Sequence, residues 1–331
     1  MKAMILAAGF GTRLKPLTLS LPKPMFPVLN RPLLEHTLNL LSSQGIQDII
    51  VNVHHLPDII IEHFGSGSDF GVRLQFSREE EILGTAGGLK KAQPFLENDT
   101  FMVINSDVLA DINIKKVLSF HKEKKSSLTM VVRKDAHPEK YKPIELAGDG
   151  RITRFVDASI ITPPAQTQRV MFTGIQIMEP EIFSRIPSGK FYGTAEDVFP
   201  KMIEDELPVY GVLHEKYWID MGTRETYIQA QADALDGKLA LKNSSSRNPE
   251  GPLLVPPVHI GKDCEISQDA QVGPYAVLGE GCRIRSGAVV ENSILWDGAT
   301  IGSDATVQNS IVGNGVTIDA GKQVIDSSQA G

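Results

Sequence analysis

The stretch Ile260-Gly-Lys-Asp-Cys-Glu-Ile266-Ser-Gln-Asp-Ala-Gln-Val272 decides the fold of the C-terminal part of the chain, because an aliphatic residue recurs in it at every sixth position. The period continues beyond this stretch, with one five-residue step before Leu295 and a second before Val312. The aliphatic positions are Ile260, Ile266, Val272, Leu278, Ile284, Val290, Leu295, Ile301, Val307, Val312, Ile318 and Val324. A hexapeptide period builds triangular coils that point one aliphatic residue per face inward and stack into a continuous core. We therefore expect a left-handed parallel β-helix of about four coils over residues 258–331.

Small residues occupy the position four after many of these aliphatic residues. They are Cys264, Ala270, Ala276, Cys282, Ala288, Ala299 and Ala305. Both cysteines of the chain belong to this set, and their separation of 18 residues equals three repeats. Because two cysteines are too few for a disulfide framework, we expect both to be small buried apolar side chains.

A linker separates these repeats from the N-terminal part of the chain. Residues 243–252 are polar and interrupted by proline and glycine, which is typical of a linker. The sequence therefore predicts a catalytic domain over 1–240, a linker over 241–257 and the β-helix over 258–331. In the first domain, short β-branched runs alternate with segments of helical period, which predicts a Rossmann-like open mixed α/β sheet. The expected strands are 2–7, 48–53, 72–76, 100–104, 128–132 and 170–177, and the expected helices include 32–45 and 114–124.

Composition and charge limit the class of function. The chain has 331 residues, of which 41% are hydrophobic, so two domains with sizeable cores are expected. The formal net charge of -7 argues against a nucleic-acid-binding surface, since such surfaces usually carry a concentrated basic patch. The first apolar run is too short for a signal peptide, and no segment approaches the roughly 20 apolar residues of a membrane span. We expect a cytoplasmic protein that binds neither nucleic acid nor membrane.

A glycine-rich turn with basic residues follows the first predicted strand. It reads Gly9-Phe-Gly-Thr-Arg13-Leu-Lys-Pro-Leu-Thr18 and continues to Pro22-Lys23-Pro24-Met25. Glycines let backbone N–H groups approach phosphate oxygens, and open α/β sheets bind ligands at the carboxyl ends of their strands. The turn is not a P-loop, because no Gly-Lys-Ser/Thr ends it. Nor is it a dinucleotide fingerprint, because Leu14 stands where a third glycine is needed.

These residues resemble the signature of the sugar-1-phosphate nucleotidyltransferases, which make nucleotide sugars. The resemblance covers essentially the whole chain, because it continues at Leu83-Gly84-Thr85-Ala86-Gly87-Gly88, Asn105-Ser106-Asp107, Trp218-Ile219-Asp220-Met221-Gly222-Thr223 and the repeats. Within the family, the chain is most similar to the mannose-1-phosphate guanylyltransferase-like branch, which carries such a tail. The resemblance implies that a sugar-1-phosphate oxygen attacks the α-phosphorus of a nucleoside triphosphate and releases pyrophosphate, without a covalent intermediate.

The resemblance also implies roles for individual residues. Arg13 should hold the triphosphate and the leaving pyrophosphate, because its planar fork suits two oxygens at once, and Lys23 should neutralise the α-phosphate. Asp107 and Asp220 should bind Mg²⁺, which prefers a few carboxylates together with phosphate oxygens. The expected catalytic residues are Arg13, Lys23 and Asp107. The expected nucleotide-binding residues are Leu6, Ala8, Gly9, Gly11, Thr12, Arg13, Glu80, Gly84 and Thr85.

The identity of the base follows from the residues that line it in the family, which here are Glu79, Glu80 and Gly84. A carboxylate only accepts hydrogen bonds, so it suits the N1–H and 2-amino donors of guanine, whereas uracil and thymine offer a donor and an acceptor together. This favours GTP. The alternative activity is UTP- or dTTP-dependent transfer to glucose 1-phosphate or an amino-sugar 1-phosphate. The alternative for residues 79–81 is that they form a solvated acidic turn and do not contact the base.

The sugar-phosphate pocket departs from the family pattern. Family members commonly carry Glu-Lys-Pro, with a lysine that grips the sugar phosphate, where this chain reads Asp157-Ala158-Ser159. The family's usual glycine after Tyr141 is replaced here by Lys142-Pro143, and Lys142 is either a replacement for the missing charge or an ordinary surface lysine. Asp157, Thr173 and Gly174 are the other candidates for sugar contacts. Residues 172–175 also resemble uridylyltransferases that act on N-acetylmuramic acid 1-phosphate, so the sugar stays open.

Two functions of other classes compete with this one. A regulatory subunit that kept the fold and lost activity is disfavoured because Arg13, Lys23, Asp107 and Asp220 are all present. An acyltransferase β-helix usually needs a histidine base near a coil edge, and His259 is the one histidine of the repeats. Stacked coils leave an open end that needs covering. We therefore expect the β-helix to pack against the catalytic domain or another subunit, and the protein to form a homo-oligomer.

Overall fold

The computed structural model describes residues 1–134, 143–239, 241 and 253–331, which form two compact units. The first unit contains Met1–Gly9 and Thr37–Trp218. The second unit contains Phe10–His36 and Ile219–Gly331. The glycine-rich turn from Phe10 onward therefore belongs to the same unit as the C-terminal repeats.

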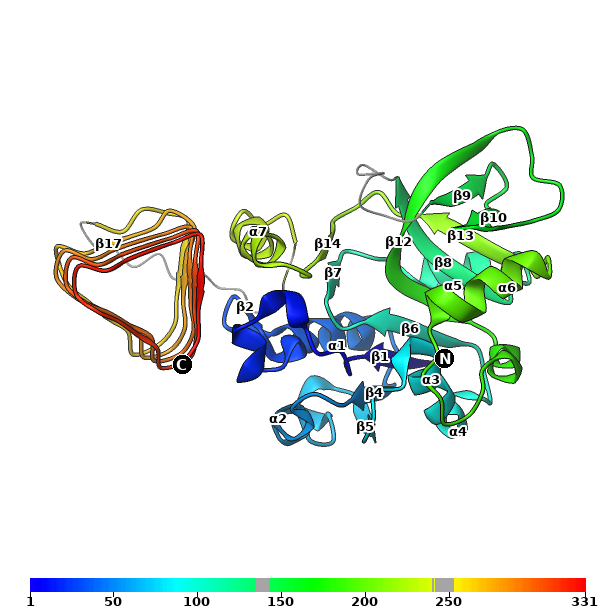
Figure 1. Cartoon of the computed structure of the whole chain (residues 1–331), viewed down its shortest axis with the longest axis horizontal. Helices are drawn as coiled ribbons and strands as arrows, with labels where there is room; N and C mark the ends of the chain where they lie inside the picture. The colour runs from blue at the N-terminus through cyan, green and yellow to red at the C-terminus, as the bar shows by residue number, and fades with distance from the viewer. Residues whose placement is uncertain (135–142, 240, 242–252) are drawn as a thin grey trace. The chain divides into compact units, whose positions relative to one another are not determined.

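A ten-stranded mixed sheet forms the centre of the first unit (Figure 1). Its parallel part has the strand order β6-β1-β4-β5. The bounds are Phe101–Asn105 for β6, Lys2–Leu6 for β1, Asp48–Val53 for β4 and Arg73–Arg78 for β5. The inner strands are nearly continuous apolar runs, as expected where helices cover both faces of a parallel sheet. All four strands lie where the sequence predicts strands.

The long strand β12 (Thr167–Met178) makes the sheet mixed, because it runs antiparallel to β6, β8 and β9. The remaining strands of this unit are β7 (Val108–Ala110), β8 (Leu128–Lys134), β9 (Ile144–Ala147), β10 (Ile152–Phe155), β11 (Ala158–Ser159) and β13 (Val209–Leu213). The predicted mixed sheet is confirmed, and so are β8 and β12. The shorter strands carry too few residues for a period to be read from the sequence.

The helices before α7 include the two that the sequence predicts, α1 and α5. Their bounds are Leu33–Ser43 for α1, Pro57–Phe64 for α2, Gly84–Lys91 for α3, Gln93–Leu96 for α4, Ile114–Glu123 for α5 and Phe199–Glu204 for α6. Helix α5 begins after Asn113, whose side chain accepts a hydrogen bond from Lys116 N. The buried His121 then bonds Thr129 Oγ1 at 2.8 Å and Glu179 Oε1 at 3.0 Å, which fastens α5 to the sheet.

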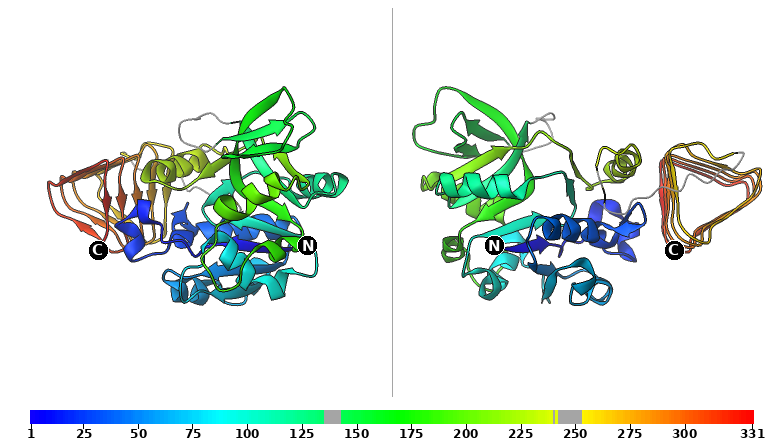
Figure 2. Two further views of the ribbon diagram at one scale, coloured as in Figure 1. Left: turned by 45° about the vertical axis from the view of Figure 1, so that its right-hand side comes forward. Right: turned by 180° about the vertical axis from the view of Figure 1, so that it is seen from behind.

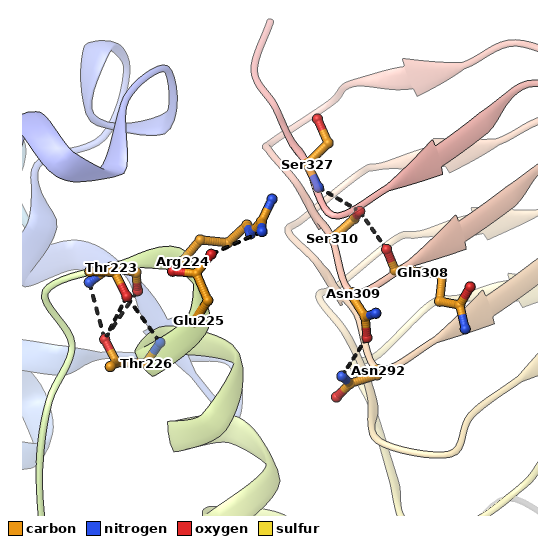
Figure 3. Close-up of polar contacts among 9 residues, drawn as sticks. All are labelled: Thr223, Arg224, Glu225, Thr226, Asn292, Gln308, Asn309, Ser310 and Ser327. Atoms are coloured by element: carbon orange, nitrogen blue, oxygen red, sulfur yellow. Dashed lines mark hydrogen bonds and ion pairs between the residues drawn. The ribbon is translucent and has the colours of Figure 1, made fainter.

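The glycine-rich turn and the segment after it form short elements in the second unit. They are 3-10 helices at Thr12–Leu14, Leu17–Leu19 and Lys23–Met25, followed by a hairpin of β2 (Pro27–Val28) and β3 (Arg31–Pro32). Leu29 and Asn30 both have positive φ, as a two-residue hairpin turn requires. Strand β14 (Trp218–Asp220) leads into α7 (Arg224–Leu235), whose Thr223 and Thr226 form a reciprocal cap (Figure 3).

The C-terminal repeats form a parallel β-helix with a triangular cross-section (Figure 1), and its strands stack in register along the axis (Figure 2). Three sheets of five, four and four strands make its faces. The strands are β15 (Val258–Ile260), β16 (Glu265–Ile266), β17 (Gln271–Val272), β18 (Ala276–Leu278), β19 (Arg283–Ile284), β20 (Val289–Glu291), β21 (Ile294–Leu295), β22 (Thr300–Ile301), β23 (Thr306–Gln308), β24 (Ile311–Val312), β25 (Thr317–Ile318), β26 (Gln323–Ile325) and β27 (Ser328–Gln329). All the predicted inward positions belong to one core, in which Ile260 and Ile266 are only partly buried. The predicted β-helix is confirmed.

The two five-residue steps are corners that shorten the coil by one residue. Val272 pairs with Val290, 18 residues on, whereas Leu278 pairs with Leu295, 17 residues on. The equivalent corner residues Asn292, Asn309 and Asp326 all have positive φ, which asparagine and aspartate tolerate better than most residues. The side chains of Asn292 and Asn309 and the serines that follow the corners form ladders along the axis, part of which Figure 3 shows. Asn292 Nδ2 donates to Asn309 Oδ1 at 2.7 Å.

The cysteines lie in register on neighbouring coils. Cys282 is fully buried and its thiol donates to Trp296 O at 3.2 Å, as expected for a small apolar side chain. Cys264 is half-buried and donates to Gly279 O at 3.0 Å. The neighbouring Cys282 thiol lowers the pKa of Cys264. The expectation of burial is therefore confirmed for Cys282 and met only in part for Cys264.

Candidate functional site

The glycine-rich turn folds back on itself within the second unit. Gly11 has φ +61°, and a β-carbon there would lie 2.8 Å from Thr18 Cγ2 and 3.5 Å from Lys23 Cβ. Thr18 Oγ1 donates to Gly11 O at 3.2 Å, and Leu14 and Leu17 are buried beneath the turn. Only glycine satisfies both the backbone conformation and the close approach. Gly11 therefore brings the two basic parts of the turn, 9–18 and 22–25, together.

Arg13 and Asp220 approach the same glycine, although they are far apart in the sequence. A β-carbon built on Gly222 would lie 2.7 Å from Asp220 Oδ1 and 2.8 Å from each terminal nitrogen of Arg13. Gly222 itself is buried, and the Arg13 side chain is exposed. A planar guanidinium and a carboxylate thus share one corner of the second unit, which suits an arginine that binds phosphate oxygens beside a cation-binding carboxylate.

Lys23 is the buried cation of the turn. It begins the 3-10 helix Lys23–Met25, between Pro22 and Pro24, and only 9% of its surface is exposed. Prolines before and after it limit the backbone to few conformations. An ammonium group at this depth is stable only with polar or anionic partners. The position is therefore restricted in both backbone and side chain, as a phosphate-binding lysine requires.

The predicted site residues near the ends of β1 and β6 lie at the carboxyl edge of the parallel strands. Leu6 at the end of β1 pairs with Asn105 at the end of β6, and Ser106 N donates to Leu6 O at 3.0 Å. Asp107 comes two residues after β6, and Ala8 and Gly9 come two and three residues after β1. The register therefore brings Leu6 and Asp107 to the same edge of the sheet, where ligands bind in open α/β folds.

The acidic turn before α3 separates into a structural and an exposed carboxylate. Glu79 is 3% exposed, and its two oxygens accept from Asn52 Nδ2 at 2.8 Å and Leu83 N at 2.9 Å. Both oxygens of Glu79 therefore hold the turn in place. Glu80 is 87% exposed at its side chain and lines a cavity of about 440 Å³. The cavity is also lined by Glu81, Leu83, Gly87, Lys91, Ser188 and Gly189.

The segment 189–194 packs against the predicted base-binding turn, and the sequence carries no signal for this contact. Gly84 has φ +72°, and a β-carbon there would lie 2.7 Å from Tyr192 O. That carbonyl accepts from Ala86 N at 2.9 Å and Gly87 N at 3.1 Å. Thr85 Oγ1 accepts from Thr194 N at 2.8 Å. The glycines of this turn are thus explained by close backbone packing as well as by room for a ligand.

The candidates for sugar contacts differ in accessibility. Thr173 is 1% exposed and its hydroxyl donates to Val131 O at 2.8 Å, so the structure gives no support to a sugar contact by this side chain. Gly174 has φ +79°, and a β-carbon there would lie 2.7 Å from Asn105 Nδ2, which puts it beside the end of β6. Asp157 is exposed in the turn between β10 and β11. Lys142 lies outside the described residues.

His259 is the histidine that an acyltransferase site in the repeats would need as a base. The ring of His259 is partly buried, which lowers its pKa, and its Nδ1 has no hydrogen-bond partner among the described residues. Nothing described there orients this ring as a base. Within the described ranges, no three His, Cys, Asp or Glu side chains gather in a metal-binding cluster. No helix in the same ranges has the length and apolar composition of a membrane span.

Comparison with known proteins finds two family profiles along the chain. The sequence profile of the nucleotidyl transferase family matches residues 2–237, and the profile of the GMPPB C-terminal domain matches residues 254–331. A UTP–glucose-1-phosphate uridylyltransferase of Synechocystis is 35% identical over 89% of this chain and 82% of its own. A mannose-1-phosphate guanylyltransferase of Mycobacterium tuberculosis is 30% identical over 87% of this chain and 82% of its own.

A solved structure is also similar to this chain. HddC from Yersinia pseudotuberculosis, crystallised in complex with GMP-PN, superposes with a TM-score of 0.59 and 27% identity, over 70% of this chain and 99% of its own. The family profile spans more than half of the chain, and its glycine-rich turn and strand-end aspartates lie in the matched part. The chain therefore belongs to the nucleotidyl transferase family, whose members transfer a nucleotidyl group.

Proposed function

We propose that this enzyme transfers the guanylyl group of GTP to mannose 1-phosphate and releases pyrophosphate. The observation that carries the transfer chemistry is the approach of Arg13 and Asp220 to Gly222, because it joins the phosphate-binding turn to a distant acidic motif. The match of the repeats to the GMPPB C-terminal domain and the guanylyltransferase relatives support the choice of substrates.

The proposed reaction is an in-line displacement at the α-phosphorus, for which positioning and charge neutralisation supply the catalysis. The planar guanidinium of Arg13 binds oxygens of the triphosphate and then of the leaving pyrophosphate. Lys23 neutralises the α-phosphate, where its restricted backbone reduces the entropy lost on binding. Residues Leu6 and Ala8, at the end of β1 and just after it, and Gly9, Gly11 and Thr12, in the first part of the turn, are the residues that we propose to contact the nucleotide.

Mg²⁺ is the proposed metal, with Asp107 and Asp220 as its protein ligands. Two carboxylates fit this ion, because magnesium usually takes one or two carboxylates and completes its octahedron with phosphate oxygens and water. When bound, the ion neutralises the crowded phosphate oxygens. A Mg²⁺ titration of turnover tests the assignment, since Asp107→Asn and Asp220→Asn should each raise the Mg²⁺ concentration needed for half-maximal activity. Unchanged titrations in both variants would contradict it.

Glu80 is the proposed acceptor for the N1–H and 2-amino group of guanine. Glu79, the other candidate, already accepts two hydrogen bonds from protein groups, whereas Glu80 is exposed at the cavity that Leu83 and Gly87 also line. Asp157, Gly174 and Lys142 are the residues that we propose for the sugar phosphate. The assignment of Lys142 depends on the charge that the chain lacks at positions 157–159.

A second candidate is uridylyl transfer from UTP to glucose 1-phosphate. The identity of 35% with the Synechocystis uridylyltransferase favours it. A matrix of four NTPs against several sugar 1-phosphates, scored for pyrophosphate release, separates the candidates. The highest kcat/KM should belong to GTP with mannose 1-phosphate. A higher value for UTP would favour the second candidate, and no activity with any pair would favour a regulatory subunit.

The proposed protein has two domains joined by a linker and forms a homo-oligomer. We assign catalysis to residues 1–240, the linker to 241–257 and the β-helix to 258–331, in a cytoplasmic homo-oligomer. Stacked coils leave unpaired backbone groups at their end, which association with another subunit would satisfy. Sedimentation at micromolar concentration tests the assembly, and a monomer would contradict it.

A further inference from the structure

One outer surface of the β-helix is apolar and buried, although it lies on the face where polar residues are expected. On the five-stranded sheet, Leu295 and its equivalents point into the core, so the neighbouring residues on each strand point outward. These outward residues are nevertheless at most 2% exposed. They are Val277, Ile294, Trp296 and Ile311. Other residues of the second unit therefore cover this surface.

Trp296 packs against the end of the glycine-rich turn. Its ring meets that of Phe26 edge to face, with centroids 4.8 Å apart and planes at 69°. Both side chains are fully buried, and Phe26 directly follows the 3-10 helix that contains Lys23. Edge-to-face packing of buried rings is favourable beyond the area that it covers, and it fixes the orientation of both rings.

A short hydrogen-bond chain runs from the same tryptophan to the backbone after the turn. Trp296 Nε1 donates to Tyr227 Oη at 3.2 Å, and the Tyr227 hydroxyl donates to Pro27 O at 2.6 Å. Burial raises the pKa of Tyr227, so its hydroxyl keeps the proton that it donates. Gln231 makes two further hydrogen bonds to this backbone, because its Nε2 also donates to Pro27 O and its Oε1 accepts from Leu29 N.

Other contacts between the β-helix and this segment point the same way. Asn30 Nδ2 donates to Leu278 O of the β-helix at 2.7 Å. A β-carbon on Gly313 would lie 3.7 Å from Leu17 Cδ2, so a second coil approaches the middle of the turn. The turn itself consists of three short 3-10 helices, which have poorer hydrogen-bond geometry than α-helices. The rigid stack of coils thus supports a segment that has little regular structure of its own.

The support reaches the phosphate-binding residues in two steps. Phe26 N donates to Lys23 O at 3.0 Å, so the ring that Trp296 holds is joined to Lys23 through one turn of backbone. Lys23 Cβ in turn lies against Gly11, which Thr18 also contacts. We propose, on the basis of the function proposed above, that Trp296 is a positioning residue for the triphosphate-binding turn. The β-helix is then part of the nucleotide site through its side, in addition to any role in assembly.

The variant Trp296→Ala tests this role. The values to compare are KM and kcat with the best substrate pair from the matrix above. We expect kcat/KM for the NTP to fall by up to about 10²-fold, as misplacement of catalytic groups by about 1 Å does. The KM for the sugar 1-phosphate should stay within about two-fold, because the turn is proposed to bind the NTP. A uniform loss of folded enzyme would instead lower the apparent kcat without changing either KM. Trp296→Phe, which keeps an aromatic ring against Phe26, should restore most of the activity.

A matched control separates positioning from stability. Ile301→Ala removes a fully buried side chain from the core of the same β-helix, on a different sheet from Trp296. It should lower the unfolding temperature while leaving the KM for the NTP unchanged. Hydrogen–deuterium exchange of residues 10–26 should rise in Trp296→Ala and not in Ile301→Ala. Tyr227→Phe keeps the packing and removes the hydroxyl, so it provides the same exchange test if Trp296→Ala fails to fold.

The outcomes distinguish this inference from the proposed function. An inactive wild-type enzyme across the whole substrate matrix would overturn the proposed function before any variant is compared. An active wild type, with the same KM for the NTP and the same exchange in Trp296→Ala, would overturn the positioning role alone. Equal losses in Trp296→Ala and Ile301→Ala would also overturn it, because the effect would then follow from stability.

Discussion

Replacing Gly222 by alanine tests the point at which Arg13 and Asp220 approach each other. The added methyl group would lie 2.7 Å from Asp220 Oδ1 and 2.8 Å from both terminal nitrogens of Arg13, whereas ordinary van der Waals contact begins at 3.4 Å. The two side chains must therefore withdraw by 0.6 to 0.7 Å, which is the difference between these distances.

The size of the effect follows from this displacement. A misplacement of about 1 Å costs about 10²-fold in rate, so the withdrawal scales to about 20-fold in kcat/KM, or about 1.8 kcal/mol of transition-state stabilisation. The displaced atoms are the ends of side chains rather than backbone, and Arg13 is exposed. The free energy of unfolding should therefore change by less than about 0.5 kcal/mol.

The assay is pyrophosphate release, with urea unfolding as the measure of stability. Gly148→Ala is a matched control, because a β-carbon built there meets no atom within 4 Å. We expect the control to keep wild-type kcat/KM and Gly222→Ala to lose most of it at nearly unchanged stability. A folded Gly222→Ala enzyme with kcat/KM within about two-fold of wild type would refute the argument that this corner binds the triphosphate.

Four further predictions follow from single side chains. Asp107→Asn should lower kcat on the order of 10³-fold through loss of a metal ligand. Its control, a change of the exposed Asp111 to Asn, should leave kcat unchanged. Equal kcat in the two variants would exclude the ligand role. Glu80→Gln should lower the ratio of kcat/KM for GTP over UTP by about 10-fold, and an unchanged ratio would assign base choice elsewhere. Ser310→Ala should cost about 1–3 kcal/mol in urea unfolding, because Ser327 N donates to Ser310 Oγ and would lose its acceptor (Figure 3); an unchanged midpoint would show that the ladder contributes nothing. Lys142→Ala should raise the KM for sugar 1-phosphate by about 10-fold, and a normal KM would make Lys142 an ordinary surface lysine.

Tertiary contacts redefine several residues that the sequence suggests for the site. Glu79 and Glu80 are adjacent and chemically alike, yet one is buried with both oxygens engaged and the other is exposed at a cavity. Thr173 lies in the segment that the family resemblance indicates, but its hydroxyl is already bonded to Val131 O. Such differences depend on neighbours that are distant in sequence. Residue type alone does not predict them.

The sequence by itself determined the β-helix, the strands of the parallel part of the sheet and the place of the glycine-rich turn after the first strand. A period of two, about 3.6 or six residues is a local property, so the buried face of each element can be read from the residues of that element alone. The tertiary structure alone decided that Arg13 approaches Gly222 next to Asp220 and that Trp296 covers Phe26. Both contacts join segments separated by about two hundred residues or more. Their geometry depends on how complete elements pack, which no local pattern of residues specifies.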